Sequence, residues 1–166
     1  MPGAGAKRWS WRQDLARLSF NPGDWRQAGG ECKDRIGTGP WTNAKGVVIA
    51  KDLQELHSPT YKINKTTALT EKGEVVPGRG DTPNEHDALT GSQQDGTVVP
   101  GTDDATCSNW TSSVDGQGSA VVGHTDLVGN SAGVNFWNYS HKTPGCAPAN
   151  LQRVGGAGRF YCFATN

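Results

Sequence analysis

Histidines and the oxygen-bearing residues near them are the groups in this sequence most able to do chemistry. The four histidines are His57, His86, His124 and His141. None of their spacings gives the HxxxH or HExxH pattern of a helical zinc site. His86 lies in "DTPNEHD", and we favour a turn with a structural role for this stretch, because it lacks the ligand spacing of an EF-hand. The alternative is a calcium site formed by Asp81, Asn84, Glu85 and Asp87, whose hard oxygen atoms can bind that ion.

A catalytic role would need a nucleophile or a metal ion next to a base. In "GHTD", His124 lies two residues before Asp126, and Ser119 or Ser140 would complete a serine triad. Triads are recognised by geometry and not by spacing, so this pattern alone does not indicate a hydrolase. A metal-assisted hydrolase that uses His86 or His124 with nearby carboxylates is a second alternative. We favour a protein that is not an enzyme.

An aromatic stretch near the carboxyl end is a candidate sugar-binding surface. An aromatic ring can cover one face of a pyranose while amides and carboxylates bond its hydroxyls. In "NFWNYSH", Trp137 and Tyr139 are the candidates for exposure, whereas Trp110 is expected in the core. The residues that we predict to bind a ligand are Trp137, Tyr139, Asn138, Asp126 and His124.

The composition indicates a single loop-rich domain that does not bind nucleic acid. The chain has 166 residues, with 23 Gly, 9 Pro and a hydrophobic content of 34%. Such values favour short strands joined by turns over long helices. The 16 basic and 16 acidic residues cancel, so no overall positive field attracts a phosphate backbone. Residues 71–126 are predominantly acidic and therefore attract cations more readily than phosphates.

Several short segments are expected to position the candidate residues. "GVVIA" (46–50) is a β-branched strand, and "KDLQELH" (51–57) suits a helical turn, with Trp41 as a core candidate before them. "SWRQDLARLSF" (10–20) is expected to form a short helix capped by Ser10. Further strands are expected at "TCSNWTS" (106–112), "SAVVGH" (119–124) and "GRFYCFA" (158–164), the last with Phe160, Cys162 and Ala164 on one face. The fold class is therefore α+β, a loop-rich mixed sheet with short helices.

The four cysteines, Cys32, Cys107, Cys146 and Cys162, favour disulfides, because no CxxC spacing typical of a zinc or redox site occurs. A bridge between Cys107 and Cys146 would close a loop of about 40 residues and stabilise the fold by about 4 kcal/mol. Disulfides form in oxidising compartments. We therefore expect a secreted, periplasmic or cell-surface protein whose export signal was lost upstream, since "MPGAGAKRW" lacks the apolar core of a signal peptide. No apolar run is long enough to span a membrane.

The order "TCSNWTS", "SAVVGH", "GC" at 145–146 and "GRFYCFA" resembles the carboxyl-terminal half of endostatin-like domains, which have a C-type-lectin-like fold. The stretches "DRIGTGPW", "NAKGV", "GRGDTPN", "HDALTGS" and "GGAGRFYCFA" are similar to a group of bacterial secreted proteins described as lectin-like. The resemblance covers residues 33–166 and implies that Cys107 is bridged to Cys146. It also implies that Cys162 pairs with a cysteine of a first helix, followed by a strand like "TWRAYLS". Both elements are missing here, which leaves Cys32 as the remaining partner for Cys162.

Residues 1–32 differ from that family, and we hypothesise that they are a frame-shifted reading of its usual amino-terminal segment. The codons GGT GAA TGC for "GEC", displaced by one nucleotide, give the family-like "VNA" before "KDRIGTGPW". We therefore expect an aberrant or poorly ordered segment over 1–32, a domain over 33–166, and a last strand that lacks its usual neighbour and is open to association. The alternative is a genuine divergent amino terminus in which Cys32 bridges Cys162.

These observations favour a non-catalytic, extracytoplasmic binding module that recognises a carbohydrate or another extracellular polymer. A structural or adhesive module that binds protein partners is the alternative. The tripeptide Arg79-Gly80-Asp81 would suit adhesion, but Gly78 and Pro83 on either side explain it as a tight turn.

Overall fold

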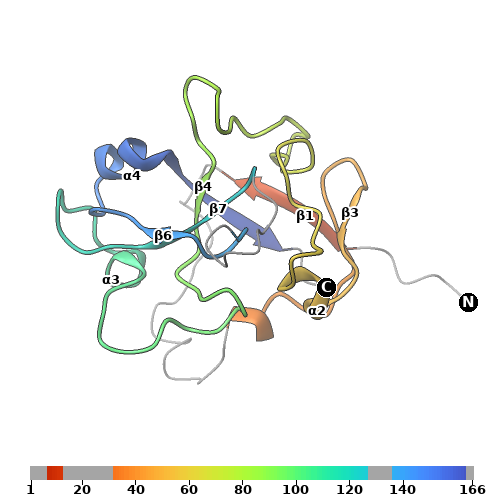
Figure 1. Cartoon of the computed structure of the whole chain (residues 1–166), viewed down its shortest axis with the longest axis horizontal. Coiled ribbons are helices and arrows are strands. Elements are labelled where there is room, and N and C mark those ends of the chain that lie inside the picture. The colour runs from red at the N-terminus through yellow and green to blue at the C-terminus, as the bar shows by residue number, and fades with distance from the viewer. Residues whose placement is uncertain (1–6, 13–31, 127–135, 164–166) are drawn as a thin grey trace, which may run out of the picture.

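Seven short strands and four short helical segments lie in a chain that is otherwise loop, within the residues that the structure describes (Figure 1). This computed structural model describes residues 7–12, 32–126 and 136–163. The strands are β1 (Lys7–Arg12), β2 (Trp41–Thr42), β3 (Val48–Ala50), β4 (Asp87–Leu89), β5 (Val121–His124), β6 (His141–Lys142) and β7 (Gly156–Phe163). The helical segments are η1 (Cys32–Asp34), α2 (Leu53–Leu56), α3 (Cys107–Trp110) and α4 (Pro148–Val154). The predicted α+β class is confirmed.

The strands follow the order β3-β2-β1-β7-β4-β5-β6. β1 is parallel to β2 and antiparallel to β7, while β4 is parallel to β7 and antiparallel to β5. The pairs β2–β3 and β5–β6 are antiparallel. The sheet is therefore mixed, with β3 and β6 as its edge strands. Figure 1 shows β7 crossing the middle of the molecule beside β1 and β4.

The amino-terminal strand β1 differs from two of the sequence predictions. Residues 10–12 belong to this strand and not to the helix predicted for 10–20, of which 13–20 lie outside the described residues. Trp9 and Trp11 alternate with polar residues, which is the two-residue period of a strand. Because β1 pairs with β7 in antiparallel register, the prediction that the last strand lacks its neighbour is wrong.

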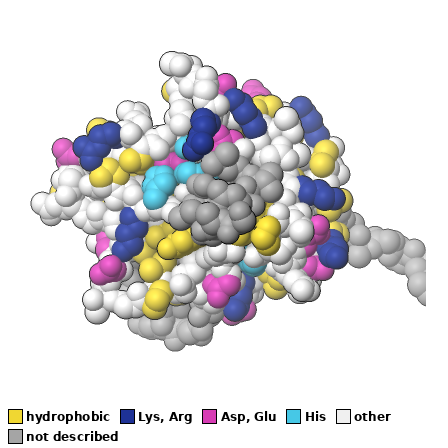
Figure 2. All heavy atoms as spheres, viewed as in Figure 1, with side chains coloured by type: hydrophobic (Ala, Val, Ile, Leu, Met, Phe, Trp, Pro, Cys, Tyr) yellow, Lys and Arg dark blue, Asp and Glu magenta, His cyan; other side chains and the backbone are white. Residues whose placement is uncertain are grey.

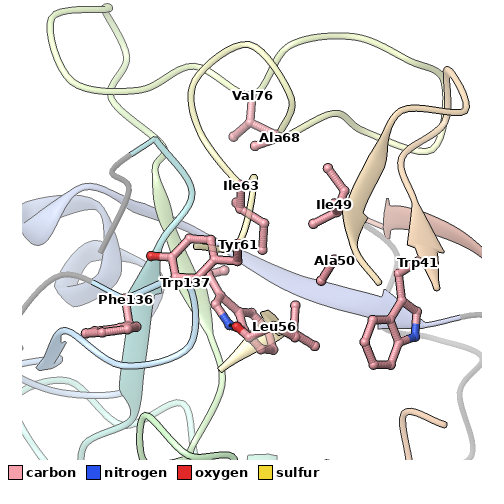
Figure 3. Packing of buried hydrophobic residues seen from close by; sticks show 11 residues of the cluster. Trp41, Ile49, Ala50, Leu56, Tyr61, Ile63, Ala68, Val76, Phe136 and Trp137 are labelled. Carbon is pink, nitrogen blue, oxygen red and sulfur yellow. Dashed lines mark hydrogen bonds between the residues drawn. The ribbon is translucent and has the colours of Figure 1, made fainter. Parts of the chain in front are cut away.

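The main core gathers side chains from β2, β3, α2 and the loops that follow, together with the aromatic stretch near the carboxyl end (Figure 3). Its buried members are Trp41, Ile49, Ala50, Leu56, Tyr61, Ile63, Ala68, Val76, Ala88, Phe136 and Trp137. Trp41 is fully buried, as predicted, and its indole N–H donates to the carbonyl of Ile36 at 3.0 Å. The strand predicted within 46–50 is also confirmed, because β3 buries Ile49 and Ala50.

Helix α2 is the helical turn predicted within 51–57. Asp52 caps it, since its Oδ1 accepts the backbone N–H of Glu55 at 2.8 Å. Leu56 is buried, and its carbonyl accepts the indole N–H of Trp137 at 2.7 Å. The turn therefore connects the aromatic stretch to the core.

The segment predicted as a strand around Cys107 is instead a left-handed turn. All four residues of α3, 107–110, have positive φ angles between 50 and 64°. The Asp104 carboxylate accepts the backbone N–H groups of Thr106 and Ser108. These side-chain bonds give the backbone an alternative to ladder pairing, which explains why no strand forms here.

Cys107 and Cys146 form the predicted disulfide, with a sulfur–sulfur distance of 2.00 Å and a Cα–Cα distance of 5.7 Å. Together with Ala120 they make a second, smaller core cluster. Trp110 packs inward against it, as predicted, and meets Phe160 edge-on at a centroid distance of 5.1 Å. The pairing of Cys162 with Cys32 stays a prediction.

A seven-residue helix, α4, precedes the last strand and was not predicted. Pro148 occupies its first turn, where a missing N–H costs nothing, and Gly155 ends it with a φ of 101°. β7 follows directly and confirms the predicted last strand. Tyr161 and Phe163 pack against the main core, on the face opposite to Phe160. Among the described residues, no helix has the length and apolar character needed to cross a membrane.

Candidate metal centre

Strands β4, β5 and β6 bring three of the four histidines to one carboxylate. His86 directly precedes β4, whose first residue is Asp87, while His124 ends β5 and His141 begins β6. Asp87 lies opposite His124, and His141 lies opposite Val122, two residues before His124. Directly opposite residues share a face of the sheet, as do residues two apart on one strand. Asp87, His124 and His141 therefore project from the same face.

Each of these imidazoles has its Nε2 atom close to the carboxylate of Asp87. The Nε2 atoms of His86 and His124 lie 3.3 and 3.2 Å from Oδ1. The Nε2 atom of His141 lies 3.5 Å from Oδ2. The rings of His86 and His124 stack with their centroids 4.3 Å apart. His86, Asp87 and His124 each offer one ligand atom within 4.8 Å of the others, and we call them the ligand trio.

The ligand trio is buried, whereas His141 reaches the surface. The side chain of Asp87 is 1% exposed, and the side chains of His86 and His124 are 6 and 7% exposed. The side chain of His141 is 37% exposed. Figure 2 shows a patch of histidine side chains at the surface beside acidic side chains. The centre therefore has a closed interior side and a side that faces solvent.

Both carboxylate oxygens of Asp87 are buried and have no hydrogen-bond partner. The imidazole nitrogens are near, yet none of them meets the geometry of a hydrogen bond to these oxygens. A carboxylate that is buried without hydrogen bonds costs several kcal/mol unless nearby groups compensate for its desolvation. A buried group of this kind requires an explanation. A cation bound between the carboxylate and the imidazoles would provide it.

Outer hydrogen bonds orient two of the rings. Nδ1 of His86 lies 2.8 Å from Oδ1 of Asp126, and Nδ1 of His141 lies 3.3 Å from the carbonyl oxygen of Lys142. In His86, an Nδ1–H that donates to Asp126 leaves a lone pair on Nε2, which is the form that a metal ion binds. Histidine ligands of metals regularly have such a carboxylate or carbonyl partner.

Asp126 also holds an exposed turn. Its Oδ2 accepts the backbone N–H of Arg79 at 2.6 Å. Gly78 makes room for this contact, because a Cβ at that position would lie 2.7 Å from Oδ2. Burial opposes ionisation, but the bonds from His86 and Arg79 outweigh it and lower the pKa of Asp126 to about 2. Two residues of the predicted ligand-binding set, Asp126 and His124, thus lie at this centre.

The charge state of the inner groups follows from their contacts. Burial opposes ionisation of Asp87, yet the contacts with His124 and His141 outweigh it, so the pKa of Asp87 lies below its ordinary value. The contact with Asp87 outweighs partial burial and raises the pKa of His141 above 6.5. The centre therefore holds a carboxylate anion at neutral pH.

The separations match the edges of a tetrahedral zinc site. Zinc binds imidazole nitrogen and carboxylate oxygen at about 2.0–2.2 Å, so neighbouring ligand atoms of a tetrahedron are about 3.3–3.6 Å apart. The two nitrogen–oxygen distances within the ligand trio are 3.3 and 3.2 Å. Two imidazoles with one carboxylate also form a ligand set that proteins use for zinc with an open position. The ligand trio therefore fits this metal.

The structure does not bring the predicted calcium ligands together. Asp81 accepts the N–H of Gly78 and pairs with Lys65 at 2.9 Å, so the carboxylate of the RGD tripeptide is engaged within its own turn. Glu85 pairs with Arg159, and Asp87 faces the histidines. Because each carboxylate has a different partner, no shared oxygen site forms from the four residues, Asp81, Asn84, Glu85 and Asp87.

The predicted exposure of Trp137 is wrong. Trp137 is 4% exposed, and its indole N–H is satisfied by a buried carbonyl, which allows the whole ring to enter the core. Asn138 is 1% exposed and donates to the carbonyl of Gln93 at 2.7 Å. Tyr139 is half-buried and packs against the main core. The aromatic stretch therefore fills the interior instead of forming an open platform.

The predicted serine triads are not assembled. Ser140 Oγ lies 3.1 Å from Nε2 of His124, but the carboxylate of Asp126 bonds to His86. The hydroxyl of Ser119 donates to a backbone carbonyl. A GxSxG pattern, "GNSAG" at 129–133, escaped the sequence analysis and lies outside the described residues.

The sequence analysis missed His141 as a member of this centre and did not connect His86 with His124. The available signal was weak, namely a histidine at the end of "SAVVGH" and another at the start of the strand in "HDAL". Strand pairing across 17 to 55 residues of sequence creates the site, and spacing along the chain cannot reveal such pairing.

No family model, curated protein or solved structure matches this chain.

Proposed function

We propose that this protein binds a divalent transition-metal ion, zinc by preference, through His86, Asp87 and His124. The observation that carries the proposal is the Asp87 carboxylate, which is buried without a hydrogen-bond partner while three imidazole nitrogens lie within 3.5 Å. A cation at this point would compensate the buried negative charge and would also use the lone pairs on the imidazoles.

The ligand types support zinc over calcium or magnesium. Imidazole nitrogen suits zinc, copper, nickel and iron, whereas calcium and magnesium prefer sets made of oxygen alone. The ligand trio has two nitrogen donors and one oxygen donor. The outer bond from His86 to Asp126 is a further feature of zinc sites in proteins.

A network of histidines and carboxylates without metal is the main alternative. It would require the Nε2 atoms of His86 and His124 to carry protons and donate to Asp87. His86 would then be an imidazolium, because its Nδ1 already faces Asp126. The absence of hydrogen-bond geometry at Asp87 argues against this network and supports a bound ion.

We further propose that the chain is a non-catalytic module of an extracytoplasmic protein with an endostatin-like, C-type-lectin-like fold. The Cys107–Cys146 bridge supports an oxidising compartment and agrees with the pairing that the resemblance implies. Carbohydrate recognition by the aromatic stretch loses its support, because Trp137 and Asn138 are buried. We therefore propose the metal centre, and not the aromatic stretch, as the binding site.

Metal analysis and titration calorimetry test the metal proposal. Metal-free protein should bind one Zn²⁺ per chain and should not bind Ca²⁺ at the same concentrations. His86→Ala, Asp87→Asn and His124→Ala should each weaken zinc binding at least about 100-fold, since loss of an outer partner alone costs about 10–100-fold. His57→Asn is the matched control, because His57 lies outside the centre and bonds to the carbonyl of Gln94. Unchanged zinc affinity in folded ligand variants would overturn the proposal.

A further inference from the structure

The ligand trio leaves one position of a tetrahedral ion to be filled. A tetrahedral ion takes four donors, and the trio supplies three. In the part of the chain that the structure describes, the group of possible ligands within 4.8 Å does not extend to His141 or to another acidic residue. His141 instead approaches Oδ2 of Asp87, whereas both trio nitrogens lie near Oδ1. The fourth donor is therefore expected from outside this group.

His141 marks the side of the centre that reaches solvent, at the edge of the sheet. The side chains of the trio are at most 7% exposed, and the strands β4 and β5 enclose them. β6, which carries His141, is a two-residue edge strand that pairs with β5 alone. The histidine patch reaches the surface on the face drawn in Figure 2. A ligand can thus approach the ion past His141.

We propose that the bound metal ion accepts a carboxylate group of an external ligand at this position, with the His141 imidazole beside it as a hydrogen-bond donor. The inference rests on the proposed zinc site. The ion and its three ligands would carry a charge of +1, which the Asp126 carboxylate behind His86 balances at a greater distance. Carboxylate oxygen is an ordinary ligand of zinc and can fill the fourth position.

His141 acts in this arrangement as a positioning residue and not as a metal ligand. Its Nε2 atom lies 3.5 Å from Oδ2 of Asp87, on the solvent side of the trio. A carboxylate that binds the ion through one oxygen would place its second oxygen near this nitrogen. The metal and the imidazole together would recognise an acidic group, as found on uronic acid polysaccharides or on acidic protein segments.

Cobalt(II) substitution separates metal binding from ligand binding. Cobalt-loaded protein has visible absorption bands that depend on the donors around the ion, and acetate is the probe. Acetate should change these bands saturably in the wild-type protein. His141→Ala should weaken acetate binding about three- to tenfold, the effect of losing one hydrogen bond. His141→Gln restores an N–H donor and should recover most of the affinity, while His57→Asn should behave like the wild type.

Three results would overturn the proposal in distinct ways. Absence of cobalt bands would overturn the metal site itself. Normal cobalt bands that acetate leaves unchanged would overturn this inference and leave the metal site standing. Tighter acetate binding in His141→Ala would mean that His141 is the fourth ligand, which also contradicts the inference.

Polymers then distinguish the source of the carboxylate. Polygalacturonate that displaces acetate from the cobalt protein, when polyglutamate does not, supports an acidic polysaccharide. The reverse result supports an acidic protein segment. Neutral dextran is the control and should not compete. Displacement by dextran would contradict recognition through a carboxylate.

Discussion

Oδ1 of Asp126 lies 2.8 Å from Nδ1 of His86, and this bond connects the buried metal centre to an exposed turn. The second oxygen of the same carboxylate accepts the backbone N–H of Arg79 at 2.6 Å. Asp126 is ionised at neutral pH because these two bonds lower its pKa to about 2 in spite of burial. The carboxylate therefore fixes the ring of His86 with Nε2 directed toward Asp87.

Replacing Asp126 by Asn should weaken zinc binding about 10–100-fold, because the outer partner of a metal-bound histidine fixes its orientation and raises its basicity. Titration calorimetry with Zn²⁺ measures the effect. Asp81→Asn is the matched control, since Asp81 bonds to the same turn through the N–H of Gly78 but does not contact a histidine. Equal zinc affinity in both variants would show that Asp126 has no role in the centre.

Zinc should raise the stability of the folded chain with the logarithm of its free concentration once that concentration exceeds Kd. At a free concentration of about 100 times Kd, a ligand that binds only the folded state adds about 2.7 kcal/mol to the free energy of unfolding. Urea denaturation with zinc and with a chelator measures this difference. Asp87→Asn should remove the zinc effect. A chelator effect of equal size in Asp87→Asn would place the stabilising metal elsewhere.

The Cys107–Cys146 disulfide should contribute about 4 kcal/mol to the free energy of unfolding, since it closes a loop of about 40 residues. It also anchors the left-handed turn 107–110, whose positive φ angles cost about 1–2 kcal/mol for each residue with a side chain. Urea denaturation of the double variant Cys107→Ala, Cys146→Ala tests this expectation.

Asp104→Asn serves as the comparison for the disulfide variant. It keeps the bridge and weakens the bonds from the Asp104 carboxylate to the N–H groups of Thr106 and Ser108, so the expected loss is about 1 kcal/mol. If the two variants lost equal stability, the turn rather than loop closure would be the origin of the effect.

Local patterns in the sequence predicted the local parts of the fold. The strand within 46–50, the turn within 51–57 and the last strand were correct, because β-branched runs, leucines spaced three residues apart and two-residue alternation act over a few residues. Helix α4 was missed although Pro148 and Gly155 mark its ends. The pairing of Cys107 with Cys146 was predicted from the family resemblance. Four cysteines allow three sets of disulfides, and the sequence alone does not choose among them.

The site could not be predicted because it exists only after the strands pair. His86 and His124 are 38 residues apart, and they meet because Asp87 lies opposite His124 in the β4–β5 register. The aromatic prediction failed for a related reason. The acceptor for the Trp137 indole N–H is the carbonyl of Leu56, 81 residues away, and the amino-acid order gives no sign of this bond.

His57 should make the fold sensitive to mild acid. Burial is the largest influence and lowers its pKa below 6.5, although the carbonyl of Gln94 and the charge of Asp95 act in the opposite direction. An unfolded chain therefore takes up a proton at His57 more readily than the folded chain does. The stabilising contribution of neutral His57 is complete above pH 6.5 and is lost as the pH falls from there toward the folded-state pKa.

The variant His57→Asn isolates this effect, because its amide can donate to the carbonyl of Gln94 as Nδ1 of His57 does at 2.8 Å, and it does not titrate. The loss of packing against Trp137 is independent of pH and therefore shifts the stability of the variant equally across the range. Urea denaturation between about pH 7.5 and pH 5 should show the wild type losing stability relative to the variant. Parallel curves across this range would mean that His57 accepts a proton in the folded state as readily as in water.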